Sequence, residues 1–110
     1  MAEEIDKTKI DMLDPSVERD VANLFKAFSN TTRIKILFAL KKQPLTVSQI
    51  SDVVSMSQSA VSHQLKELKM ARLVTNERRG REMIYELDDD HVHQIFDMAI
   101  EHVLEIYHYE

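Results

Sequence analysis

Four polar side chains near the end of the chain have the types and the spacing of metal ligands. They are two histidines and two carboxylates: Asp89, His91, His102 and Glu105. Two nitrogen and two oxygen donors suit the tetrahedral coordination of zinc. Cobalt accepts the same donors, whereas nickel usually takes a larger ligand set. These donors therefore predict zinc, with cobalt as a substitute and nickel as a poorer fit.

Two further histidines stand close to this set in the sequence. His93 lies off the helix face that the four residues share, so a solvated histidine is the simpler interpretation. His108 falls at the end of the expected helix, where fraying is common. Either one could raise the number of nitrogen ligands for nickel, but residues 1–20 contribute no histidine.

The distance along the helix determines how many chains such a site needs. His91 and His102 are eleven residues apart, close to three turns, so they share a face that Glu105 also approaches. That separation is about 16 Å, whereas a zinc–nitrogen bond is about 2 Å long, so one ion cannot reach both histidines. An antiparallel second copy would bring Asp89 and His91 of one chain to His102 and Glu105 of the other. The alternative is a polar stripe that only forms hydrogen bonds across a dimer interface.

A second set of side chains has the types that contact DNA. Short or forked polar groups, which suit base edges, occupy one face of an expected helix over 57–69: Gln58, Ser59, Ser62 and His63. Cations suited to phosphate follow on the same helix and on a basic turn: Lys66, Arg78, Arg79 and Arg81. An amphipathic surface helix without a ligand is the simpler reading of 57–69 taken alone.

The elements that would position these residues form a mainly α fold with a small β-hairpin. Residues 46–69 predict a helix-turn-helix, because Thr46 and Gln49 form a capping box and Ser57 can cap the second helix. Residues 73–87 predict a hairpin, or wing, with the only glycine of the chain at its turn. Residues 90–106 predict the last helix. Residues 1–14 are expected to be flexible or to form a short helix.

Length and charge agree with a small DNA-binding domain. The 110 residues fit a single domain, 1–110, which a dimer interface would stabilise. Residues 33–81 carry ten basic and three acidic side chains, while residues 82–110 carry nine acidic ones and no Lys or Arg. A basic middle between acidic ends favours a polyanion as ligand. We expect a cytoplasmic protein with no membrane partner, since we find neither a signal peptide nor a long apolar run.

The sequence resembles the ArsR/SmtB family of metal-responsive repressors over residues 17–106. The segments that carry this resemblance are the run Ser57 to Leu65, Leu73-Val74, Arg79-Gly80-Arg81, Tyr85, Leu87-Asp88-Asp89 and His91. The resemblance implies a winged helix-turn-helix homodimer that represses by binding an imperfect inverted repeat in operator DNA. It also implies release by metal and control of genes for metal efflux or sequestration.

The resemblance also assigns roles to the polar residues of the last helix. The family's ligands there, an Asp-x-His and a His-x-x-Glu, match Asp89, His91, His102 and Glu105. It implies an allosteric relay from the second imidazole nitrogen of His102 to a backbone carbonyl near Arg72. Metals sensed through thiolates are disfavoured, because the chain has no cysteine.

Other functions remain open from the sequence. A winged-helix regulator that dimerises through its last helix could sense a non-metal signal, or none, and the acidic helix could instead dock a protein. An enzyme is not expected, because we find no nucleophile–base pair and a single glycine disfavours a phosphate-binding loop.

Overall fold

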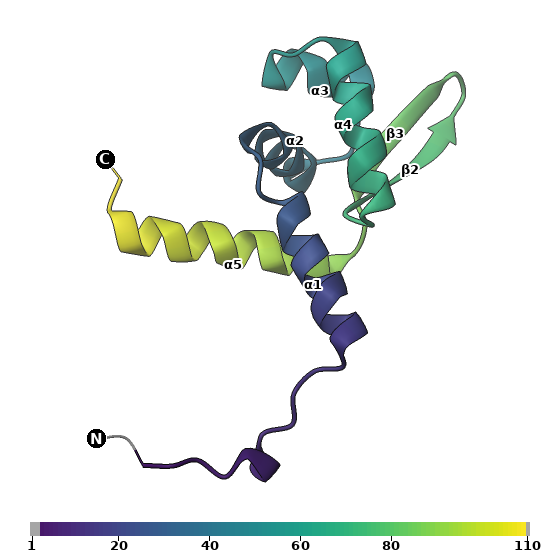
Figure 1. Cartoon of the computed structure of the whole chain (residues 1–110). Helices are drawn as coiled ribbons and strands as arrows, with labels where there is room; N and C mark the ends of the chain where they lie inside the picture. The colour runs from purple at the N-terminus through teal and green to yellow at the C-terminus, as the bar shows by residue number, and fades with distance from the viewer. Residues whose placement is uncertain (1–2, 110) are drawn as a thin grey trace.

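The computed structural model describes residues 3–109 and confirms a winged helix-turn-helix with long outer helices (Figure 1). In chain order the elements are the 3-10 helix η1 (Lys7–Lys9), α1 (Pro15–Ala27), α2 (Thr31–Lys42), β1 (Leu45–Thr46), α3 (Val47–Val54), α4 (Gln58–Met70), β2 (Val74–Arg79), β3 (Glu82–Leu87) and α5 (Asp90–Tyr107). Residues 1–2, part of the segment expected to be flexible or helical, lie outside the described residues. Within 3–14, the short η1 is the only regular element.

Short polar side chains set the starts of the inner helices, as the sequence predicts. The Asn30 side chain accepts hydrogen bonds from two first-turn N–H groups of α2. Thr46 and Gln49 form the reciprocal capping box of α3, at 2.9 and 3.2 Å. The Ser57 hydroxyl caps α4 at 3.1 Å. Ser55 adopts a left-handed conformation, with φ of 58°, and so makes the tight break between α3 and α4.

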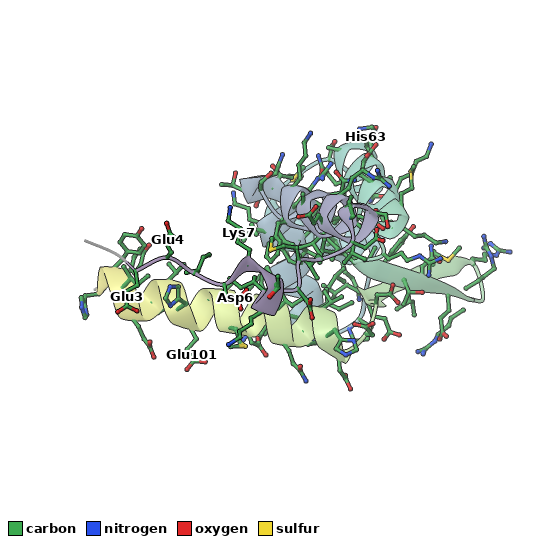
Figure 2. All side chains as sticks on the ribbon, turned by 60° about the horizontal axis from the view of Figure 1, so that its bottom comes forward. Glu3, Glu4, Asp6, Lys7, His63 and Glu101 are labelled. Carbon is green, nitrogen blue, oxygen red and sulfur yellow. The ribbon has the colours of Figure 1, made fainter. Side chains whose placement is uncertain are left out.

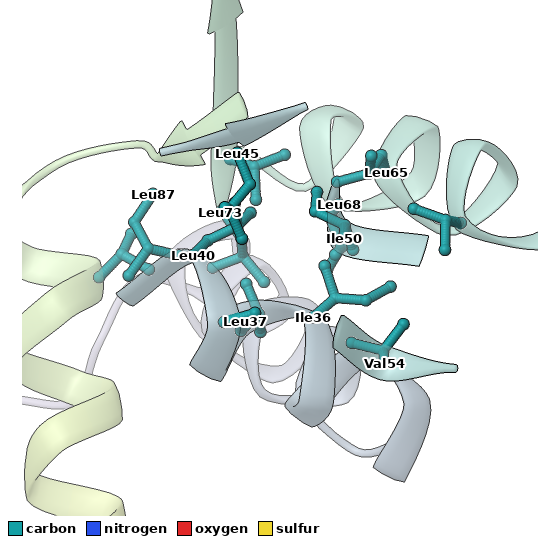
Figure 3. Packing of buried hydrophobic residues seen from close by; sticks show 14 of the residues in the cluster. Ile36, Leu37, Leu40, Leu45, Ile50, Val54, Leu65, Leu68, Leu73 and Leu87 are labelled. Atoms are coloured by element: carbon teal, nitrogen blue, oxygen red, sulfur yellow. The ribbon is translucent and has the colours of Figure 1, made fainter. Parts of the chain in front are cut away.

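The core lies between α2, α3, α4 and the wing (Figure 3). Its largest fully buried side chains come from all four: Ile36, Leu37, Leu40, Ile50, Val61, Leu65, Leu68, Leu73 and Val74. Val61, Leu65 and Leu68 recur at helical spacing, so one side of α4 is entirely buried. This packing fixes which side of α4 faces outward.

The wing is a three-stranded antiparallel sheet in the order β1-β3-β2. The predicted hairpin is confirmed, and Gly80 has a φ of 64° at its two-residue turn, between paired Arg79 and Glu82. The third strand, β1, was not expected from the sequence. It is only two residues long, and Leu45 pairs with Tyr85. So short a segment shows no alternation, and its pairing partner lies far along the chain.

Helices α1 and α5 are the least buried of the α-helices. The first turns of α5 pack on the body through buried Val92 and Phe96, but its second half projects away from α3, α4 and the wing (Figure 1). Apolar side chains on both helices are exposed, including Phe25 at 58% and Leu104 at 55%. Within residues 3–109, no helix is both long and apolar enough to cross a membrane.

Candidate DNA-binding face and metal ligands

Helix α4 presents all the residues predicted to contact bases on its solvent side. Its exposed side, here called the reading face, carries Gln58, Ser59, Ser62 and His63. Gln58 and Ser62 are one turn apart, as are Ser59 and His63, so the four side chains form a double row. Lys66 continues the first row and is also exposed. Figure 2 shows His63 on the opposite side of the molecule from Glu101 of α5, which separates the reading face from the acidic helix.

The three wing arginines are exposed but are not equivalent. Arg78 and Arg79 are neighbours on β2, so their side chains leave opposite faces of the hairpin. The Nε of Arg79 donates a 2.6 Å hydrogen bond to the carboxylate of Glu77, which neutralises part of its charge. Arg81 lies in the turn itself and has no carboxylate partner among the described residues. Arg78 has no such partner either, so Arg78 and Arg81 face less competition for a phosphate than Arg79 does.

A groove of about 240 Å³ connects the reading face to the wing. Gln58 and Arg81 lie on its lining, together with Thr46, Val47 and Ser48 of the α3 start. The sequence had indicated only a capping role for Thr46 and no role for Ser48. Two elements that each carry residues predicted to contact DNA thus share one concave surface with the first turn of α3.

Arg33 makes a contact that the sequence did not indicate, where it counted only as one of the basic residues of segment 33–81. Arg33, at the start of α2, donates a 2.9 Å hydrogen bond from Nε to the side-chain oxygen of Gln64 on α4. Its Nη1 lies 3.5 Å from the carbonyl oxygen of Ala27 in α1. Both side chains are half-buried. No local pattern could have paired Arg33 with Gln64, because the two residues are 31 positions apart.

The first pair of predicted metal ligands lies at the start of α5. Oδ1 of Asp89 caps the helix by accepting the N–H of Val92 at 3.1 Å. Its Oδ2 lies 3.6 Å from Nδ1 of His91, whose side chain is 85% exposed. The hydrogen bond from the Val92 N–H holds the pKa of the Asp89 carboxyl below its usual range; desolvation opposes this effect, and the neighbouring His91 adds smaller lowering contributions. The carboxylate is thus anionic and still has one oxygen free to bind a cation.

The second pair, His102 and Glu105, lies near the other end of α5, and both side chains are exposed. Among residues 3–109, no three His, Asp or Glu side chains come close enough together to hold a metal ion. One chain therefore presents two separate half-sets rather than a site. This arrangement fits the expectation that a second copy is needed.

The predicted relay between His102 and Arg72 is not formed within one chain. Arg72 stands exposed after α4 with a φ of 60°, whereas the second half of α5 projects away from α4 (Figure 1). The link that the structure does show there is a 3.0 Å hydrogen bond from the Asp88 N–H to the Leu73 carbonyl. It ties the start of the wing to the start of α5.

An apolar groove of about 350 Å³ lies where α1, α2 and α5 meet. We call it the helix groove, and its lining is Phe25, Phe28, Ile34, Ile95, Phe96, Ala99, Ile100, Val103, Leu104 and Tyr109. An apolar surface of this size on a small domain usually marks a contact with another molecule. It is continuous with the exposed second half of α5, which also carries His102 and Glu105.

Comparison with known proteins relates both the fold and the sequence to bacterial regulators. The model of a family described as "Bacterial regulatory protein, arsR family" matches residues 30–76, from the cap of α2 into β2. A solution structure of apo-NmtR superposes with a TM-score of 0.76 at 38% identity, covering 89% of this chain and 82% of that one. The matched family segment contains the helix-turn-helix but stops before α5.

Full-length relatives extend the match beyond that segment. The HTH-type transcriptional regulator NmtR of Mycobacterium tuberculosis is 41% identical over 90 residues, covering 82% of this chain and 75% of the relative. The transcriptional repressor SmtB homolog of Synechocystis is 31% identical over 103 residues, covering 94% and 78%.

Proposed function

The chain belongs to the arsR family of bacterial regulatory proteins, and on this premise we propose that it is a metal-responsive repressor released from operator DNA by zinc. Members of this family are transcriptional regulators, not enzymes. Its relatives include a transcriptional repressor and a cadmium resistance regulatory protein, which supports repression and metal response here. Genes for metal efflux or sequestration are the corresponding targets.

The DNA contacts follow from the geometry of α4 and the wing. Gln58 and Ser62 on the reading face enter the major groove, where a glutamine can pair with adenine through two hydrogen bonds. Lys66 and Arg81 contact phosphates on either side and supply affinity without sequence choice. His63, Ser59, Arg78 and Arg79 complete the interface.

A homodimer supplies the second recognition helix that an inverted repeat requires. The helix groove and the exposed apolar side of α1 support an interface formed by α1 and α5. Exposed Phe25 and Leu104 line that groove and would be buried by a second copy. Burying such side chains stabilises a dimer by about 1.5–3 kcal/mol for each one fully covered.

The observation that carries the zinc proposal is the placement of two exposed half-sets at opposite ends of one helix. In an antiparallel dimer, Asp89 and His91 of one chain join His102 and Glu105 of the other, which gives zinc its preferred donors. Cobalt is the expected substitute, and nickel fits less well. When bound, the metal supplies a fixed link between the two copies of α5.

That link explains why metal would weaken DNA binding. The two copies of α4 must match half-sites about one turn of DNA apart, so an interface held at another angle lowers DNA affinity. By linkage, DNA lowers metal affinity to the same degree. A relay from His102 to the backbone near Arg72 would have to join two chains, because the second half of α5 projects away from α4.

A second candidate function keeps the DNA-binding unit but replaces the metal by another signal. It is favoured by two observations: the matched family segment, residues 30–76, excludes α5, and the helix groove is wholly apolar. In this case α5 serves dimerisation, and its polar side chains only form hydrogen bonds across the interface.

A titration with two readouts separates these functions. A duplex selected by the protein from random-sequence DNA is labelled, and its binding is followed by fluorescence anisotropy while zinc is added. Release of the duplex as about one zinc per chain binds supports the proposal. Unchanged DNA binding at saturating zinc, cobalt and nickel supports the second candidate. A protein that selects no duplex sequence would refute both functions.

A further inference from the structure

Helix α2 is the element that contacts both the dimerisation helices and the recognition helix. Near its end, Lys41 forms a 2.9 Å ion pair with Asp97 of α5, and the ring centroid of Phe38 lies 6.4 Å from that of Phe96. At its start, Arg33 reaches both α1 and α4. A displacement of α5 therefore acts on α2, as well as on the start of the wing through the hydrogen bond from Asp88 to Leu73.

Arg33 makes a directional link between α2 and α4, two helices whose buried residues share the apolar core. Among the described residues, its bond to Gln64 is the only side-chain hydrogen bond between α4 and another helix. Apolar packing of α2 on α4 resists separation but tolerates small rotations, whereas a guanidinium bond fixes both distance and orientation. Gln64 directly follows Ser62 and His63, so a rotation at Gln64 turns the reading face.

The same guanidinium also reaches the end of α1. Nη1 of Arg33 lies 3.5 Å from the carbonyl oxygen of Ala27, and the next residue, Phe28, stacks on Phe96 of α5 at 6.2 Å between ring centroids. One half-buried side chain thus touches the last turn of a dimerisation helix and the middle of the recognition helix.

We propose that Arg33 is a positioning residue for DNA reading, which passes a change at the α1–α5 interface to the reading face through Gln64. This inference rests on the proposed function, because it names the route by which the bound metal alters DNA affinity. Arg33 touches neither DNA nor metal in this scheme. Its effect is on the coupling between the two ligands, not on either affinity by itself.

The test uses the full-length dimer and variants that keep side-chain volume. Gln64→Met and Arg33→Met each remove the hydrogen bond, and Lys35→Met is the matched control. Lys35 lies on the same helix, carries the same charge and has no ion-pair partner within residues 3–109. For each variant, zinc affinity, the unfolding midpoint and DNA affinity with and without zinc are measured.

We expect Gln64→Met to bind zinc with the affinity of the wild type. The factor by which zinc lowers DNA affinity should be about three- to tenfold smaller in this variant than in the wild type. Combining it with Arg33→Met should reduce the coupling no further, since both substitutions remove one interaction. Lys35→Met should keep the full change. A full zinc effect in Gln64→Met would overturn the proposal, whatever its unfolding midpoint, and this variant carries the test if Arg33→Met does not fold.

A metal-free readout separates failure of this inference from failure of the zinc proposal. The N–H groups of Phe28 and Ser29 donate to carbonyls in the last turn of α1, at 3.1 and 3.0 Å. If Arg33 links this turn to α4, DNA should slow the hydrogen exchange of both amides in the wild type but not in Gln64→Met. Equal slowing in both proteins would refute the link. If the two proteins differ in hydrogen exchange in this way but the wild type does not respond to zinc, only the zinc proposal is refuted.

Discussion

The Nδ1 atom of His91 lies 3.6 Å from Oδ2 of Asp89, at the first turn of α5. The other oxygen of the same carboxylate caps the helix. Asp89 therefore has two separable roles. Capping needs only an oxygen that accepts a hydrogen bond, whereas metal binding also needs the negative charge of the carboxylate.

Substitution of Asp89 can separate these roles. Asn caps a helix as well as Asp does, so Asp89→Asn should leave the unfolding midpoint unchanged. Its zinc affinity should fall at least about tenfold, because the neutral amide is a poor ligand. Asp89→Ala should lower both quantities. Chelator competition and thermal unfolding measure them, and unchanged zinc affinity in Asp89→Asn would remove Asp89 from the ligand set.

The reading face and its flanking cation should respond differently to truncation. Gln58→Ala should cost about 1–3 kcal/mol on the selected duplex and relax the preference at one base pair. Lys66→Ala should weaken binding to all duplexes alike and reduce the slope of log affinity against log salt by about 1. Anisotropy titrations at several salt concentrations, on the selected and a scrambled duplex, check both. The interface assigned to α4 is wrong if the two variants behave alike.

The wing offers a substitution that should tighten DNA binding. Glu77→Gln removes a carboxylate that holds the Nε of Arg79 at 2.6 Å. The freed guanidinium and the lost negative charge should both favour phosphate, so affinity should rise and the salt slope should steepen. Arg81→Ala, the comparison variant, should do the reverse. Weaker binding by Glu77→Gln would instead indicate that Glu77 orients Arg79 for its contact.

Local sequence signals predicted the elements that local interactions form. Thr46 and Ser57 mark helix starts because each cap is satisfied within three residues, and Gly80 marks the turn because glycine takes a positive φ there at no steric cost. Helical spacing also placed Val61 inward, which put the reading face outward. These features were available before any tertiary contact was known.

Features that depend on distant pairing were not predictable in this way. β1 exists only because Leu45 meets Tyr85, and Arg33 shows its role only once α4 folds against α2. The proposed metal site is a more extreme case, since one chain separates its two half-sets and only their chemistry suggests that a second chain completes them.

Dimerisation through the helix groove gives the last prediction. Phe25 is 58% exposed and lines this groove beside α5. Phe25→Glu would bury an unpaired carboxylate in any interface formed there, so it should convert the dimer to a monomer in sedimentation equilibrium. Val53→Glu is the matched control, because Val53 is 64% exposed but lies outside the groove.

The monomer should also lose the ligands that depend on two chains. Because Phe25 is 58% exposed and is not part of the buried core, the variant should keep the helical content of the wild type. It should bind the selected duplex far more weakly, since one recognition helix contacts one half-site. Zinc should bind weakly too, because the half-sets at Asp89 and His102 no longer meet. A Phe25→Glu protein that remains dimeric, or a monomer that keeps tight zinc binding, would contradict the antiparallel arrangement of α5.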